Sequence, residues 1–189
     1  DWSSDVCSSD LYQVPWPELP WRIRPGEFTV VSGYSGHGKT QMLNHLLVHL
    51  ASCGARIFDA SLEIKPAKTL QMMVRSAMAK REPEGMAELS ECMNWLNNNL
   101  WFYDFVGSVN KDKLMEAMKY ARKRFGIDIF VIDSLFKCGI SGDDLNGQRS
   151  FMDELTTFCN DTGAHVILVA HSRKLENEDH IPTKTDIAG

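Results

Sequence analysis

A glycine-rich turn within residues 27–53, between a short apolar run and a helical pattern, constrains this sequence more than any other feature. The eight letters GYSGHGKT fit the pattern G-x-x-x-x-G-K-[ST]. Gly36 adds a third glycine, which lets backbone N–H groups close around an anion. The pattern predicts a strand, a phosphate-binding loop and a helix whose N-terminus faces the bound phosphates.

The residue types in this loop match what a bound nucleoside triphosphate requires. Lys39 can reach the β and γ oxygens, and the Thr40 hydroxyl can coordinate Mg²⁺. Glycine-rich turns before helices also occur without a ligand, but an eight-residue match between a predicted strand and helix favours the nucleotide site. The residues expected to bind nucleotide are Gly33, Ser35, Gly36, His37, Gly38, Lys39, Thr40 and Gln41.

The composition fits a single globular domain. Of the 189 residues, 43% are hydrophobic and 24% charged, which is enough for one buried core. The formal net charge of −5 argues against a protein that coats nucleic acid with its whole surface, although it leaves room for a local basic groove. Five cysteines without a C-x-x-C pair favour neither zinc nor a disulfide framework. Because no 18-residue apolar run or signal-peptide pattern occurs, we expect a soluble cytoplasmic protein with no membrane partner.

Two unusual stretches precede the phosphate loop. Residues 1–11 lack apolar periodicity and resemble a translated sequencing-adapter read, so we expect a non-native or disordered scar. Residues 12–26 alternate prolines with tryptophans, which excludes helix and favours an extended arm with aromatic anchors. Such an arm can pack on its own domain or on a neighbour's. Residues 27–189 form the predicted core.

Strands and helices alternate through this core. Apolar runs predict strands at residues 27–31, 55–60, 100–105, 127–134 and 165–172. Helical patterns follow the phosphate loop and recur at residues 66–80, 86–97, 110–124 and 149–160. This alternation predicts an α/β fold with a mostly parallel central sheet and helices on both faces.

Polar residues follow the predicted strands at their C-terminal ends, the edge where parallel sheets bind ligands. Asp133 follows the apolar run IFVI and is placed to hold Mg²⁺ through water. Its successor is Ser134 and not glutamate, so another acid must orient an attacking water, and Glu63 is the best-placed candidate. His171 can hydrogen-bond the γ-phosphate. The plainer alternatives are a surface turn residue for Glu63 and a loop cap for His171.

Two further patterns have both a functional and a plain interpretation. His45 and His49 have the spacing of zinc-binding histidines, but Leu46 stands where that motif has glutamate, which favours ordinary helix-face residues. The end of helix 110–124 is basic and can contact phosphates, yet basic residues there also complement the helix dipole. These basic residues are Lys119, Arg122, Lys123 and Arg124.

Four motifs in this order resemble the RecA-like ATPase domain of hexameric replicative DNA helicases: GYSGHGKT, SLEI, FVIDS and LVAHSRK. The chain looks like the Twinkle and phage primase-helicase branch, with DnaB more distant, and the resemblance covers about residues 21–189. It implies a RecA-like P-loop NTPase in which Lys39 and Thr40 hold phosphate and Mg²⁺. It also implies that Glu63 is the catalytic base, that Asp133 is the Walker B acid and that His171 senses the γ-phosphate. DnaB-type members carry glutamine at this last position, so the histidine favours the phage and Twinkle branch.

The resemblance also implies a function and partners. Members hydrolyse ATP or dTTP, assemble as hexameric rings, move 5′ to 3′ on single-stranded DNA and unwind duplexes, which places this chain in a bacterial or phage-infected cell. Loops after the fourth and fifth strands line their channel, and these loops correspond to residues 137–148 and 172–184 here. The first loop is acidic and lacks aromatic residues, which weakens its expected part in DNA contact. The expected DNA-binding residues are Arg173, Lys174 and Lys184.

The sequence ends at TDIAG, where the last channel-lining motif of the resembled family begins. The arginine finger of that family lies beyond this motif, and it completes the site of the next subunit. We therefore expect the core to be C-terminally incomplete, to bind Mg²⁺–nucleotide and to hydrolyse it poorly. Unpaired strand edges would also make it prone to association.

Two other functions stay open from the sequence alone. A RecA-type recombinase or mediator is compatible with FVIDS. The histidine sensor with SRK behind it speaks against this function, as does a proline-rich arm where a recombinase needs a polymerisation strand. In a KaiC-like regulatory ATPase, the basic residues after His171 would form a solvated loop without a role in DNA binding.

Overall fold

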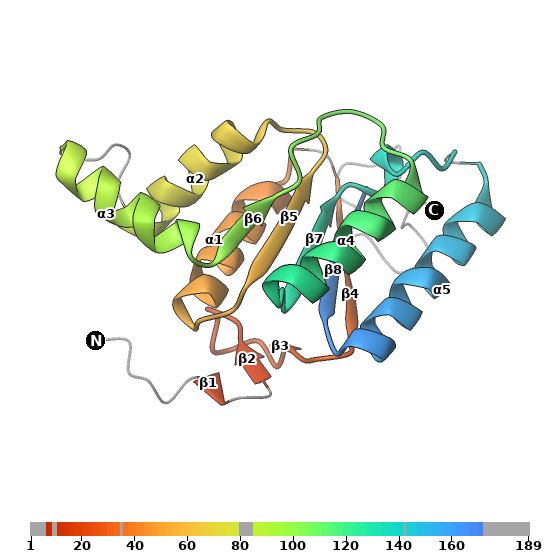
Figure 1. Ribbon diagram of the computed structural model, residues 1–189, viewed down its shortest axis with the longest axis horizontal. Coiled ribbons are helices and arrows are strands. Elements are labelled where there is room, and N and C mark those ends of the chain that lie inside the picture. Colours follow the sequence, from red (N-terminus) through yellow and green to blue (C-terminus); the bar gives the residue numbers. More distant parts are fainter. Residues whose placement is uncertain (1–6, 9–10, 35, 80–84, 142, 172–189) are drawn as a thin grey trace.

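The computed structural model describes residues 7–8, 11–34, 36–79, 85–141 and 143–171. It contains a central sheet with helices on both faces (Figure 1). The sheet has the strand order β4-β8-β7-β5-β6, and every neighbouring pair is parallel. Its strands are β4 (Phe28–Gly33), β5 (Ile57–Ser61), β6 (Leu100–Phe102), β7 (Ile129–Asp133) and β8 (His165–His171). The predicted α/β fold with a parallel sheet is therefore confirmed.

The helices divide between the two faces according to the direction of the chain across the sheet. From β4 the chain moves to β5 and then to β6, and afterwards it returns to β7 and β8. Because parallel connections are right-handed, this reversal puts the later helices on the opposite face. One face carries α1 (Lys39–Ser52), α2 (Pro66–Met78) and α3 (Met86–Asn97), and the other carries α4 (Lys111–Phe125) and α5 (Leu145–Thr162).

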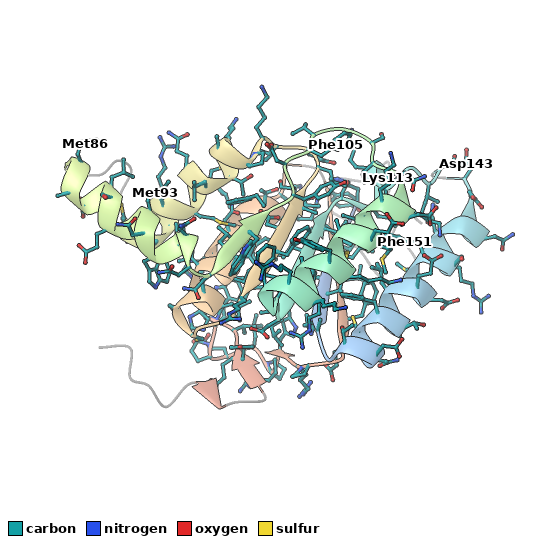
Figure 2. The ribbon with its side chains drawn as sticks, viewed as in Figure 1. Met86, Met93, Phe105, Lys113, Asp143 and Phe151 are labelled. Atoms are coloured by element: carbon teal, nitrogen blue, oxygen red, sulfur yellow. The ribbon has the colours of Figure 1, made fainter. Side chains whose placement is uncertain are left out.

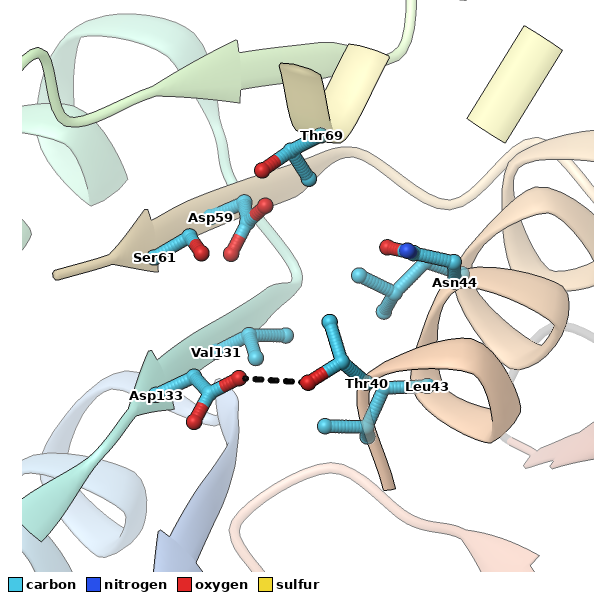
Figure 3. A pocket seen from close by; sticks show the side chains of 9 residues that line it. Thr40, Leu43, Asn44, Asp59, Ser61, Thr69, Val131 and Asp133 are labelled. Carbon is cyan, nitrogen blue, oxygen red and sulfur yellow. Dashed lines mark hydrogen bonds between the residues drawn. The ribbon is translucent and has the colours of Figure 1, made fainter. Parts of the chain in front are cut away.

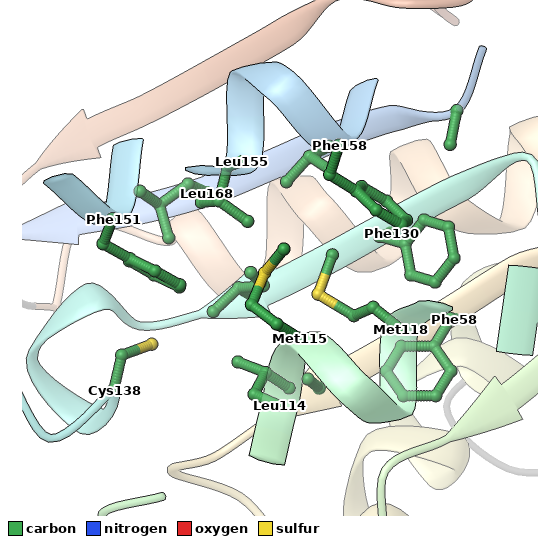
Figure 4. Close-up of a cluster of buried hydrophobic side chains, with 14 of the residues drawn as sticks. Phe58, Leu114, Met115, Met118, Phe130, Cys138, Phe151, Leu155, Phe158 and Leu168 are labelled. Carbon is green, nitrogen blue, oxygen red and sulfur yellow. The ribbon is translucent and has the colours of Figure 1, made fainter. Parts of the chain in front are cut away.

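Successive side chains of each central strand enter the cores on opposite faces, as the two-residue period of a strand requires. In β7, Ile129 and Val131 pack toward α1, whereas Phe130 and Ile132 pack toward α4 and α5. Figure 4 shows the second of these cores, in which Phe130 lies beside Phe158. All five residues of β7 are buried, so its last residue, Asp133, is held by a rigid strand.

Two element boundaries differ from the sequence-based prediction by three residues or more. Helix α5 begins at Leu145, four residues early, because the Asp144 side chain accepts a hydrogen bond from the Gly147 amide and caps the helix. Strand β6 ends at Phe102, three residues early, where the chain turns and Phe105 becomes exposed. The predicted loop 137–148 is correspondingly shorter, since a 3₁₀ turn (Leu135–Lys137) and the first turn of α5 occupy its two ends.

The arm before the phosphate loop packs on its own domain. It forms a small antiparallel sheet from β1 (Cys7–Ser8), β2 (Leu11–Gln13) and β3 (Arg22–Ile23). Val14 and Ile23 are buried in the core under α1, and the two tryptophans of the arm pack against the same core. Since β1 lies within residues 1–11, part of that stretch pairs with the arm, and its non-native origin stays a prediction.

Helix α3 lies at the periphery of the fold. Figure 2 shows Met86 and Met93 at its outer side, and Leu96 is its one buried residue. None of the helices in the described ranges is both long enough and apolar enough to cross a membrane.

Candidate nucleotide site

The phosphate loop joins β4 to α1 at the C-terminal edge of the sheet. Gly36 and Gly38 have φ angles of +86° and +79°, a conformation that glycine adopts at little cost. No side chain caps the N-terminus of α1, so the first amides of this helix stay available to an anion. His37 is exposed in the loop and its ring contacts Tyr34 edge-on at 5.4 Å. Ser35, one of the predicted ligands, lies outside the described residues.

Lys39 folds back across the loop. Its Nζ donates hydrogen bonds to the carbonyl oxygens of Gly33 at 2.7 Å and Tyr34 at 2.8 Å. Partial burial lowers the pKa of Lys39, although the charges of Asp133 and Glu63 oppose this shift. Phosphate oxygens are stronger acceptors for an ammonium group than peptide carbonyls are. A bound phosphate can therefore replace these two carbonyl oxygens as the hydrogen-bond acceptor of Lys39.

Thr40 and Asp133 supply oxygen ligands of the kind that Mg²⁺ prefers. The Thr40 hydroxyl, in the first turn of α1, lies 3.5 Å from Asp133 Oδ2 at the end of β7. Burial and then the charge of Glu63 raise the pKa of Asp133, against the opposing effects of His171, Lys39 and the Thr40 hydrogen bond. A hydroxyl beside a poorly solvated carboxylate fits a small divalent cation.

Glu63 lies beside this pair because the pairing of β5 with β7 continues past the end of β5, where the Leu62 amide donates to the Asp133 carbonyl at 2.8 Å. The Ser134 hydroxyl donates to Glu63 Oε1 at 2.9 Å, and His171 Nε2 lies 3.4 Å from the same oxygen. The predicted base and the predicted sensor are thus in direct contact.

Two residues of this cluster were missed by sequence reasoning. Ser134 was noted only for lacking a carboxylate, yet its hydroxyl orients Glu63. Phe136 stacks on the His171 ring with centroids 5.8 Å apart and is 40% exposed. The hydroxyl directly after Asp133 was visible in the sequence. The contact between Phe136 and His171 depends on the 3₁₀ turn after β7, and no sequence pattern indicated it.

A small cavity beside Thr40 and Asp133 was missed as well (Figure 3). Its most unusual member is Asp59, a carboxylate in the middle of buried strand β5. Burial and then the charge of Asp133 raise the pKa of Asp59 to about 7. The signal in the sequence was the aspartate that interrupts the otherwise apolar run of β5.

The remaining sequence patterns do not join the site. His49 Nε2 donates to the Gln13 carbonyl at 3.0 Å and the His45 ring contacts Trp16, so this pair connects α1 to the arm. No group of three potential metal-ligating His, Cys, Asp or Glu side chains occurs in the part of the chain that the structure describes. At the basic end of α4, Arg122 is bonded to the Thr162 carbonyl and to Asp128. The expected DNA contacts Arg173, Lys174 and Lys184 lie outside the described residues.

A parallel sheet with a phosphate loop after one strand, and further polar groups at the C-terminal ends of the strands beside it, is the arrangement of an α/β ligand-binding domain. The chain belongs to the AAA domain family, whose model matches residues 8–177.

Curated relatives point to the helicases. The chain is 25% identical over 187 residues to a DNA helicase/primase of Enterobacteria phage T3, covering 88% of this chain and 33% of that protein. It is 27% identical over 198 residues to the chloroplastic/mitochondrial Twinkle homolog protein of Arabidopsis thaliana, covering 92% of this chain and 27% of that protein. The chain therefore spans about a third or less of the length of either relative.

Solved structures give the same fold. One solved ATPase domain aligns with a TM-score of 0.66 at 17% identity, covering 84% of this chain and 62% of that one. A DnaB-like replicative helicase aligns with a TM-score of 0.68 at 16% identity, covering 86% and 44%. The expected RecA-like ATPase fold is confirmed by these alignments, and the sequence of this AAA-family domain is similar to those of helicases.

Proposed function

We propose that this chain is the motor core of a replicative DNA helicase. It couples ATP or dTTP hydrolysis to translocation on single-stranded DNA and to duplex unwinding, and it acts within a hexameric ring in the cytoplasm of a bacterial or phage-infected cell. The observation that carries the proposal is the contact between Glu63 and His171 beside the Thr40–Asp133 pair, because it links a hydrolytic base to a group able to detect the γ-phosphate. The helicase relatives support the same function.

Each residue of the site has a role in this proposal. The loop amides and Lys39 bind the phosphates, and Thr40 and Asp133 hold Mg²⁺. When bound, Mg²⁺ neutralises charge on the β and γ oxygens. Glu63 accepts a proton from the attacking water, and its Oε2 is suited to this because Ser134 and His171 both contact Oε1. His171 detects the γ-phosphate, because its hydrogen-bond partner changes when that phosphate is lost.

The proposed DNA contacts rest on the sequence alone. Strand β8 ends at His171, and the segment that follows it in the sequence contains Arg173, Lys174 and Lys184. Lysine and arginine provide the sequence-independent, salt-sensitive part of single-strand binding. A change at His171 would therefore reach the DNA through the segment attached to the same strand.

Nucleotide binding is the first test of the proposal. The purified chain is titrated with a fluorescent nucleotide in the presence and absence of Mg²⁺. Lys39→Ala should abolish binding, because it removes the charge that neutralises the β and γ oxygens. Lys113→Ala is the matched control, since Lys113 is an exposed lysine on α4, and it should bind like the wild type. Equal binding by wild type and Lys39→Ala would overturn the phosphate-loop assignment.

Phosphate release with and without single-stranded DNA tests the motor function. We expect these 189 residues to bind nucleotide but to turn it over slowly, because an arginine finger from a neighbouring subunit typically contributes ~10³–10⁵ in rate. Strong DNA-stimulated turnover by the chain alone would contradict a site shared between subunits. Absence of DNA stimulation in a longer protein that contains this domain would contradict the helicase function itself.

A further inference from the structure

The cavity beside the proposed metal ligands has the size of a binding site for one small molecule. It lies between α1, α2, β5 and β7 and has a volume of about 10 Å³, roughly the space of one water. Three apolar side chains close part of its wall. The polar side chains that line it are Thr40, Asn44, Asp59, Ser61, Thr69 and Asp133.

Two of these polar groups lack a hydrogen-bond partner among the described residues. They are Asn44 Nδ2 and Thr69 Oγ1, in residues that are only 4% and 1% exposed. A buried polar group left unpaired costs about 1–3 kcal/mol. Figure 3 shows the Asn44 amide and the Thr69 hydroxyl both turned into the space beside the Asp59 carboxylate. Asn44, Thr69 and Asp59 therefore contribute one unpaired donor, one unpaired hydroxyl and one carboxyl group to the lining of the cavity.

The chemistry of these groups selects the occupant. An anion would meet the carboxylates of Asp59 and Asp133, and a metal ion would meet the N–H groups of Asn44. An apolar molecule would leave both unpaired groups unsatisfied. A water can accept from Asn44 Nδ2, donate to Asp59 and bond Thr69 in either direction, and buried waters typically make about three such bonds.

We propose that Asn44, Asp59 and Thr69 bind one internal water, and that this water positions the proposed Mg²⁺ ligands Thr40 and Asp133. Asn44 lies one helical turn after Thr40 on the same face of α1. On the sheet, Ser61 of β5 is directly opposite Asp133 of β7. The water thus connects the first turns of α1 to β5 and α2, and it holds the Thr40 hydroxyl at its distance from Asp133. The positioning role rests on the proposed function, whereas the water site does not.

A high-resolution crystal structure of the nucleotide-free chain tests the water site directly. We expect one water within hydrogen-bond distance of Asn44 Nδ2, Thr69 Oγ1 and the Asp59 carboxylate. The same water should persist in Thr69→Ser, which keeps the hydroxyl, and be lost in the double variant Asn44→Leu/Thr69→Val. An empty cavity in the wild type, or side chains closed directly onto one another, would overturn the proposal whether or not the chain binds nucleotide.

Nucleotide titration tests the positioning role with a readout other than turnover. The double variant should weaken binding about tenfold in Mg²⁺ and less than twofold in EDTA, because only the metal ligands lose their support. Thr69→Ser keeps the hydroxyl and should bind nucleotide like the wild type both with and without Mg²⁺. Asn94→Leu, at an exposed position on α3, is the matched control and should change neither affinity. Equal weakening with and without Mg²⁺ would show that the water does not position the metal ligands.

Discussion

The two faces of the sheet use the same strands to build different interiors. Toward α4 and α5, the core is apolar and rich in aromatic rings, with Phe130, Phe151 and Phe158 all buried (Figure 4). On the face toward α1, the sheet packs against the arm and borders the phosphate loop, and it encloses the cavity that contains Asp59. Adjacent residues of β5 divide between them, since Phe58 enters the first core and Asp59 faces the cavity.

This difference indicates a division of labour. The α4–α5 face stabilises the sheet through close packing of apolar side chains. The α1 face holds the predicted nucleotide site, and its buried polar residues cost stability. Changes on the first face should therefore alter folding without altering the site, and changes on the second should alter the site more than folding.

The largest expected effect is on stability and lies on the apolar face. Phe151→Ala should lower the free energy of unfolding by about 3–5 kcal/mol, because Phe151 is fully buried and its loss leaves a cavity. Denaturant titration followed by circular dichroism measures the change. Leu145→Ala on the same helix removes a side chain that is 56% exposed and should cost less than about 1 kcal/mol. Equal losses from the two variants would show that this face is not a packed core.

The second effect concerns the pH dependence of stability and lies on the polar face. The pKa of Asp59 is about 7 in the folded protein against 3.8 ordinarily, so between these values the folded state keeps a proton that the unfolded state has released. The free energy of unfolding must then fall as pH rises from about 4 to about 7. Asp59→Asn removes this dependence. The free energy of unfolding of Asp59→Asn, relative to that of the wild type, should therefore increase by on the order of 4 kcal/mol between about pH 4 and pH 8.

Denaturant titrations of both proteins across this pH range measure the gain. Asp153→Asn is the control, because Asp153 is exposed on α5, and the stability difference between this variant and wild type should stay nearly constant with pH. A constant difference between Asp59→Asn and wild type would show that Asp59 is ionised in the folded protein throughout the range.

The same contrast explains how much could be predicted from the sequence. The placement of the phosphate loop, Asp133, Glu63 and His171 at one edge of the sheet could be predicted, because each follows a recognisable strand and parallel strands present their C-terminal ends at one edge. The roles of these residues stay predictions. The cavity could not be predicted, since it depends on the register that puts Ser61 opposite Asp133. The start of α5 was missed because Asp144 was interpreted as a loop residue and not as a helix cap.

The third effect is on hydrolysis. Glu63→Gln should reduce the single-turnover rate of phosphate release by about 10², the usual scale for loss of a general base, while nucleotide affinity stays nearly intact. Glu91→Gln, at an exposed position on α3, should change neither quantity. If affinity and rate fell together in Glu63→Gln, Glu63 would be a ligand or a structural residue and not the base.

The smallest effect isolates Ser134, whose only proposed task is to orient Glu63. Ser134→Ala removes the hydroxyl that donates to Glu63 Oε1 at 2.9 Å and leaves His171 as the remaining contact of that oxygen. The carboxylate then rotates more freely, and the single-turnover rate should fall about tenfold, which corresponds to ~1.4 kcal/mol, the scale of one hydrogen bond. Nucleotide affinity should not change, because within the described residues no hydrogen bond joins Ser134 to the phosphate loop or to Thr40. In a Glu63→Gln background there is no base left to orient, so the same substitution should slow release less than twofold. A full tenfold loss in that background would show that Ser134 acts independently of Glu63. The hydrogen bond between them would then be no evidence that the buried polar groups of the α1 face serve the reaction.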